Sequence, residues 1–110
     1  MTTFDEREEA FERKFVHDED LRFKATARRN KLLGLWAAGR LGKSGAEADA
    51  YARSVVLADF EEAGDGDVLR KVCADLEAAG VADADASETE IRLRMDTLMT
   101  QAMREIMAGR

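Results

Sequence analysis

None of the 110 residues of this chain is proline. Proline is the residue that most firmly interrupts a helix, because it lacks the backbone N–H and its ring clashes with the preceding turn. The chain is rich in alanine, leucine, glutamate and arginine, which have high helix propensity, and only 6% of its residues are aromatic. Runs of valine, isoleucine and threonine of the kind that form sheets are missing. We therefore predict an all-α fold in one domain, since a chain of this length has room for one core.

Composition also limits the classes of partner and the location. The net charge of −6 favours solubility and argues against a nucleic-acid partner. No run of 18 apolar residues is present, which predicts no membrane insertion, and the first 20 residues lack the apolar stretch of a signal peptide. The single cysteine has no partner for an internal disulfide. We therefore expect a cytoplasmic protein.

Helix start and stop signals divide the chain after residue 20 into four amphipathic segments. Ser44 with Glu47, and Ser87 with Glu90, have the spacing of capping boxes, and glycines such as Gly42 stand where helices commonly end. The predicted helices span residues 21–41, 45–63, 67–79 and 88–108. Because short loops join neighbouring helices, we predict an antiparallel four-helix bundle over residues 21–110.

Several apolar side chains are candidates for the core of this bundle. Leu32, Leu35 and Trp36 are the bulky residues of the first helix, and Cys73 shares an apolar helix face that predicts a buried structural thiol. Methionines recur at every fourth position of the last helix. They indicate either core packing or a soft, adaptable docking surface. These methionines are Met95, Met99, Met103 and Met107.

Residues 1–20 form an N-terminal arm that the bundle does not need. Phe4, Phe11 and Phe15 fall on one face of a helix, and charged residues on the other face offer ion pairs. An amphipathic helix with aromatic anchors is the form that docks in a groove of another protein. The alternative is that the arm folds back on its own bundle. Near His17 the arm either continues into the next helix or hinges.

Charge is unevenly distributed along the chain. Residues 21–46 contain seven basic residues and no acidic ones, whereas residues 47–67 contain seven acidic residues and one basic one. Either the oppositely charged helices pack side by side, or the basic helix presents a face to an acidic partner or a nucleotide. In the second interpretation ADP or ATP would bind weakly. The anion-binding residues would be Arg28, Arg29, Lys31 and Lys43.

The sequence contains no catalytic or metal-binding motif. His17 is the only histidine, which excludes a histidine-based metal cluster. Gly42-Lys43-Ser44 resembles the end of a phosphate-binding loop, but Ala37 stands where that loop needs glycine, and a helix precedes it. We therefore expect neither an enzyme nor a resident cofactor or metal.

Taken in order, these residues resemble a known family. The chain is similar to the zeta subunit of alphaproteobacterial F-type ATP synthases, a family of inhibitors of the F1-ATPase. The resemblance spans nearly all 110 residues. It is densest in MTTFDEREEAFERKFVHDEDLRFKATARRNKLLGLWAAGRLG, from Met1 to Gly42, and again in ADFEEAGD, from Ala58 to Asp65.

This resemblance implies a function for the arm. Its inhibitory segment, Met1 to about Phe15, would insert into a catalytic interface of F1 and stop ATP hydrolysis while leaving synthesis largely free. The implied partners are the alpha, beta and gamma subunits of F1, and the implied location is the cytoplasmic side of the inner membrane, peripheral to it. The implied contact residues are Phe4, Arg7, Glu8, Phe11, Glu12, Lys14 and Phe15. The residues alone leave open a nucleotide- or anion-binding regulatory module and a helical adaptor with an unrelated partner.

Overall fold

The computed structural model of the chain describes residue 13 and residues 18–59, 66–81 and 87–109. Within these ranges every regular element is an α-helix, and no strand occurs. The helices are α2 (Glu19–Arg40), α3 (Gly45–Ala58), α4 (Gly66–Ala78) and α5 (Glu88–Met107). The predicted all-α fold of four packed helices is confirmed.

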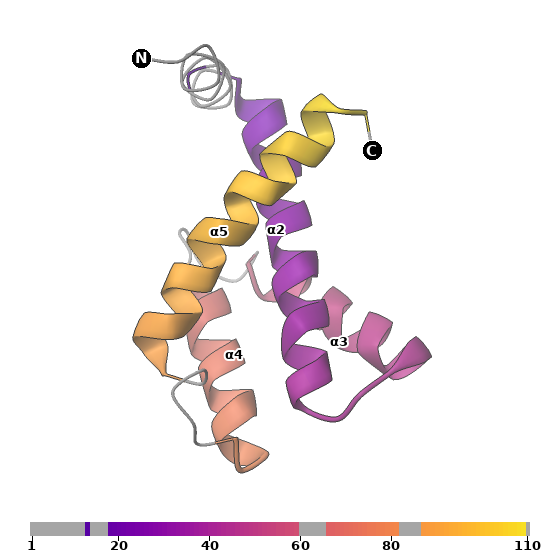
Figure 1. Cartoon of the computed structure of the whole chain (residues 1–110), viewed down its shortest axis with the longest axis vertical. Helices are drawn as coiled ribbons and strands as arrows, with labels where there is room; N and C mark the ends of the chain where they lie inside the picture. The colour runs from indigo at the N-terminus through magenta and orange to yellow at the C-terminus, as the bar shows by residue number, and fades with distance from the viewer. Residues whose placement is uncertain (1–12, 14–17, 60–65, 82–86, 110) are drawn as a thin grey trace.

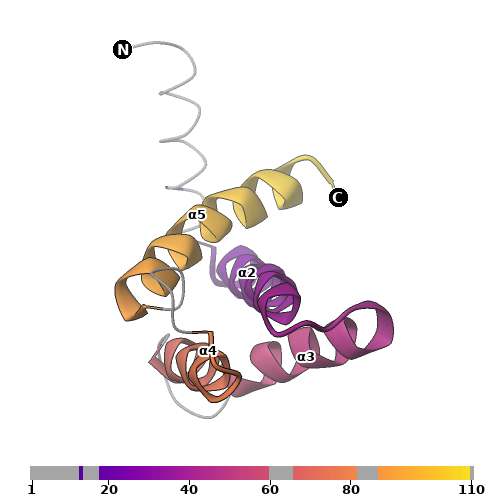
Figure 2. The same cartoon turned by 60° about the horizontal axis from the view of Figure 1, so that its bottom comes forward.

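The long helix α2 lies at the centre of the bundle. It packs mainly against α3 and α5 and also contacts α4, so the other three helices surround it when it is viewed end-on in Figure 2. Figure 1 shows that α5 runs back along α2 toward the end at which α2 begins. The last turn of α5 therefore lies beside the first turns of α2, next to the point where the arm joins.

All four helices contribute to one apolar core. The side chains of Leu33, Val55, Val68 and Ile91, one from each helix, have no exposed surface. Ala37, Leu69, Val72, Leu76 and Met95 complete the buried cluster. Burial of a large aliphatic side chain contributes about 1.5–3 kcal/mol, so this cluster is the main source of stability.

The bulky residues predicted to anchor the first helix lie nearer the edge of the core. Leu33 is fully buried, whereas Leu32 and Leu35 are half-buried. Trp36 packs against the core cluster, and the guanidinium of Arg94 from α5 lies 4.3 Å from the ring centroid. Trp36 is therefore part of the core, as predicted, but at its edge, where a cation–π contact with Arg94 lies over the ring.

Two of the helix ends follow their predicted signals. The hydroxyl of Ser87 accepts a hydrogen bond from the N–H of Glu90 at 3.2 Å. After α2, Gly42 has a φ of 78°, and the N–H of Lys43 donates to the carbonyl of Ala38 at 2.8 Å, as in a Schellman C-cap. Glycine adopts this left-handed backbone without the strain that a Cβ would add.

One predicted capping box and one predicted helix end need correction. Ser44 is the N-cap of α3, but among the described residues its side chain makes no capping hydrogen bond, so the predicted capping box is wrong. The helix ends at Ala58, earlier than the predicted end at 63, because the N–H of Asp59 donates back to Val56 at 3.3 Å in a tighter turn. The predicted residues 60–63 lie outside the described residues.

The axes of α2 and α3 approach closely at Gly34. A Cβ on this residue would lie 2.6 Å from the Cα of Ala52 and 3.3 Å from the Cβ of Val55. The missing side chain therefore sets how closely the two helices pack, and glycine is required here for a tertiary reason.

Candidate functional site

The junction between the arm and the bundle is defined by Asp18. This residue has extended backbone angles (φ −112°, ψ 103°), and α2 begins after it at Glu19. The carboxylate of Asp18 accepts a hydrogen bond from the N–H of Leu21 at 3.1 Å, which caps the first turn. Since Asp18 is not helical, α2 does not continue an earlier helix through this residue, and of the two predicted alternatives the hinge agrees with this geometry. The predicted contact residues of the arm lie outside the described residues, as does His17. These contact residues are Phe4, Arg7, Glu8, Phe11, Glu12, Lys14 and Phe15.

The four basic residues predicted to bind an anion have different environments. Arg28 forms an ion pair with α5 at 3.5 Å, and Lys31 is exposed. Arg29 is only 3% exposed, and its guanidinium donates to Asn30 Oδ1 at 3.1 and 2.7 Å. Lys43 lies beyond the other end of α2, past Arg40, which is itself roughly 14 Å from Lys31 along the helix axis at 1.5 Å per residue. The structure thus brings Arg28 and Lys31 together, and places Arg29 and Lys43 elsewhere.

The uneven charge distribution contributes modestly to the packing. Helix α2 lies beside α3, as in the first interpretation, but α3 contains only Glu47 and Asp49 of the seven acidic residues, together with one basic residue, Arg53. One ion pair that joins α2 to another helix runs from Arg28 to Glu105 of α5, and Lys24 pairs within α2 with Asp20 at 3.2 Å. Such partly exposed pairs are each worth about 1 kcal/mol or less. The apolar contacts between α2 and α3 therefore dominate their association.

A groove runs over the outside of the bundle where α2, α3 and α5 meet. Its apolar lining consists of Phe23 and Ala27 from α2, Val56 from α3 and Ile106 from α5. Three cations of α2 also line it: Lys24, Arg28 and Lys31. We call this feature the basic groove. A neighbouring hollow between α2 and α3 shares Lys31 and Val56 with it and adds Leu57.

The apolar part of this groove was not predicted from the sequence. Val56 and Ile106 fit the apolar faces of their helices, yet both are only half-buried. Phe23 lies outside the phenylalanine stripe of the arm and is 57% exposed. The available signal was the four-residue spacing of Phe23, Ala27 and Lys31, which puts an aromatic ring and a cation on one helix face.

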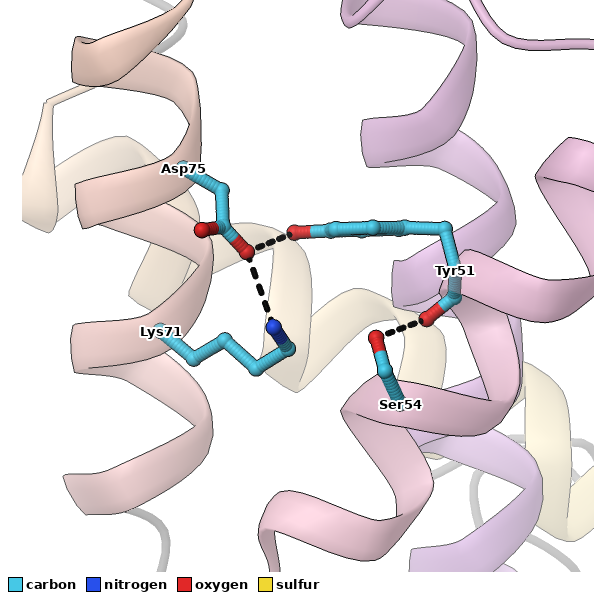
Figure 3. Close-up of polar contacts among 4 residues, drawn as sticks. All are labelled: Tyr51, Ser54, Lys71 and Asp75. Carbon is cyan, nitrogen blue, oxygen red and sulfur yellow. Dashed lines mark hydrogen bonds and ion pairs between the residues drawn. The ribbon is translucent and has the colours of Figure 1, made fainter.

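A polar cluster joins α3 to α4 on another side of the bundle (Figure 3). The hydroxyl of Tyr51 donates to Asp75 Oδ2 at 2.8 Å, and Lys71 Nζ donates to the same oxygen at 3.0 Å. Lys71 Nζ also lies 5.2 Å from the centroid of the Tyr51 ring. Burial, followed by the hydrogen bond to Asp75 and its negative charge, raises the pKa of Tyr51 well above its usual value. The cluster links α3 to α4 through hydrogen bonds that converge on one carboxylate oxygen.

This cluster predicts an unusual alkaline titration. Tyr51 is the only tyrosine, so tyrosinate absorbance reports this residue alone. In the folded chain tyrosinate should appear only well above the usual pKa of about 10, and Asp75→Asn should lower the titration point. Above about pH 10 the unfolded chain ionises first, so the free energy of unfolding should fall as the pH rises. Asp96→Asn, which removes an exposed carboxylate on α5, should leave the titration point of Tyr51 unchanged. Titration of Tyr51 near pH 10 in the folded chain would exclude its hydrogen bond to Asp75.

The remaining candidate groups that the structure describes form neither a reactive thiol site nor a metal site. Cys73 is half-buried against the core, and burial together with the carboxylates of Glu88 and Glu77 raises the pKa of its thiol. The thiol therefore stays protonated at neutral pH and is a poor nucleophile. Among the described residues no group of three or more potential ligands could hold a metal ion. No described helix is long and apolar enough to cross a membrane.

Comparison with known proteins assigns the chain to a family. A family model described as ATPase inhibitor subunit zeta matches residues 1–105. The chain belongs to this family. The resemblance found in the sequence is confirmed, and the family consists of inhibitors of an ATPase, which are regulators and not enzymes.

A solved structure supports the fold of this zeta-family chain. A solution NMR structure is 51% identical in sequence, covers 82% of this chain and 99% of its own, and superposes with a TM-score of 0.70. No curated protein matches the chain. The zeta-family assignment therefore rests on the family model, and the NMR structure shows that a close relative has the same fold.

Proposed function

We propose that this zeta-family chain inhibits ATP hydrolysis by the F1 sector of ATP synthase by inserting the inhibitory segment of its arm, Met1 to about Phe15, into a catalytic interface. The observation that carries the proposal is the family match, which begins at residue 1 and so includes the arm. The partners would be the alpha, beta and gamma subunits of F1. The chain would then be cytoplasmic and peripheral to the inner membrane when it is bound to ATP synthase.

The geometry of the junction supports separate roles for the arm and the bundle. Asp18 interrupts the helical backbone, so the arm need not follow the axis of α2. The four described helices share a core to which each contributes a fully buried side chain. The bundle would therefore act as a folded body that carries the arm, and the arm would supply the phenylalanines and charges that contact F1.

The mechanism follows from the rotation of the enzyme. Phe4, Phe11 and Phe15 would anchor the arm in an apolar slot between subunits, and the surrounding charges, among them Arg7, Glu8, Glu12 and Lys14, would set its register. Hydrolysis must close the interface that holds the arm, so a wedged helix opposes that step. Rotation in the direction of synthesis opens the same interface and releases the wedge.

The direct test is an assay of ATP hydrolysis by purified F1 from the same source. The full chain should inhibit, and a shortened chain lacking residues 1–17, which keeps the N-cap Asp18 of α2, should not, while its bundle remains helical and melts cooperatively. Undiminished inhibition by the shortened chain would exclude the arm mechanism. Loss of cooperative melting would instead show that the arm belongs to the core.

A further inference from the structure

We infer that the basic groove is a second docking surface for F1, which seats an apolar projection flanked by carboxylates at the edge of the interface that takes the arm. The inference rests on the proposed function and extends it from the arm to the bundle. The groove would set the orientation of the bundle on F1 after the arm has inserted.

Few residues separate the arm from the basic groove. Asp18 is the junction, α2 begins at the next residue, and Phe23 follows one turn later. At 1.5 Å per residue Phe23 lies only about 6 Å along the axis from the start of α2. Only residues 16–18 stand between residue 15 and the start of α2, so a partner that holds the arm as far as residue 15 also faces this end of the bundle.

Large exposed apolar side chains line the basic groove and the hollow beside it. Among the described residues the large exposed ones are Phe23 (57%), Leu57 (63%), Leu93 (55%) and Met107 (36%). Phe23 lines the basic groove, and Leu57 lines the hollow that shares Lys31 and Val56 with it, whereas Met107 and Leu93 line neither. Leu93 lies roughly 20 Å back along α5 from Ile106 at 1.5 Å per residue. Exposed apolar groups that cluster in this way indicate an interaction site.

The basic groove differs in charge from the chain as a whole. The whole chain carries a net charge of −6, yet among the described residues the lining of the groove contains three cations, Lys24, Arg28 and Lys31, and no carboxylate. Asp49 lines the neighbouring hollow together with Lys31. Two of these cations have carboxylate neighbours, Asp20 and Glu105. In the part of the chain that the structure describes, no carboxylate pairs with Lys31. An occupant that brings a carboxylate toward Lys31 would complete the charge pattern and increase the association rate.

The test compares full-length variants as inhibitors of F1-catalysed ATP hydrolysis. Phe23→Ala removes the aromatic wall, and Ala27→Gln fills the groove with a larger, helix-compatible side chain. Leu93→Ala is the matched control, because Leu93 is as exposed as Phe23 but lies outside the groove. Each groove variant should raise the half-inhibitory concentration about tenfold, and the control should not change it. Melting curves of both groove variants show whether each keeps the fold. If Phe23→Ala does not fold, Ala27→Gln still tests the groove.

Adding the arm variant Phe11→Ala separates this inference from the proposed function. If Phe11→Ala weakens inhibition and both groove variants do not, the second docking surface is excluded and the arm mechanism stands. If the groove variants weaken inhibition and Phe11→Ala does not, the arm mechanism fails and the groove contact stands. Stronger inhibition by the groove variants would overturn the inference in another way, because it would show that the groove holds the arm back in the free protein.

Discussion

Replacing Phe11 with alanine should weaken inhibition of F1 by at least about thirtyfold and leave the melting temperature nearly unchanged. Phe11 is the middle anchor of the aromatic stripe. A hot-spot aromatic at an interface contributes about 2 kcal/mol or more to binding, and about 1.4 kcal/mol corresponds to a tenfold change in affinity. The same substitution leaves the described core untouched, since Leu33, Val55, Val68 and Ile91 are buried within the bundle.

The measurement is the half-inhibitory concentration of each variant in the F1 hydrolysis assay, paired with a melting curve. Glu9→Ala is the control within the arm, because an ion pair at the rim of an interface is worth about 1 kcal/mol or less. A Phe11→Ala variant that inhibits as well as the native chain would remove the aromatic stripe from the mechanism. A large fall in its melting temperature would show instead that Phe11 packs on the bundle.

The second large effect should come from Gly34→Ala, which we expect to destabilise the bundle by about 1–3 kcal/mol. Alanine is the better helix former by about 1 kcal/mol, so helix propensity alone predicts the opposite sign. The new Cβ would lie 2.6 Å from the Cα of Ala52, however, and backbone cannot move aside as a flexible side chain can. The two helices would have to separate, and the apolar contacts between α2 and α3 would loosen. The melting temperature should fall by roughly 5 °C or more.

Gly39→Ala provides a matched control on the same helix. A Cβ at Gly39 meets nothing within 4 Å, and its backbone does not have a positive φ. The substitution should therefore stabilise the bundle, by up to about 1 kcal/mol, through helix propensity. Equal effects of the two substitutions would show that the close approach of α2 and α3 does not limit the packing.

Local signals determined much of the fold. Complete absence of proline, apolar periodicity and glycine punctuation predicted four helices at nearly the observed positions, because helix formation and termination depend on residues within one or two turns. Capping was predicted less well. Ser87 caps α5 with its side chain, whereas Ser44 has the same spacing to a glutamate and does not, since a cap also depends on how the preceding loop arrives. The arm stands out in the sequence for the same local reason, as a phenylalanine stripe before a chain of helices.

Tertiary contacts decided the rest. The sequence could not show that Gly34 faces Ala52, that Arg94 covers Trp36, or that Tyr51 reaches Asp75, because each contact joins residues from different helices. The same is true of the basic groove, whose lining residues come from three helices. Periodicity identifies the apolar face of a helix, but the rotation and crossing of neighbouring helices decide which part of that face is covered. The sequence by itself therefore determined the helices, the arm and the family, and only the packed bundle determined which apolar side chains remain available to a partner.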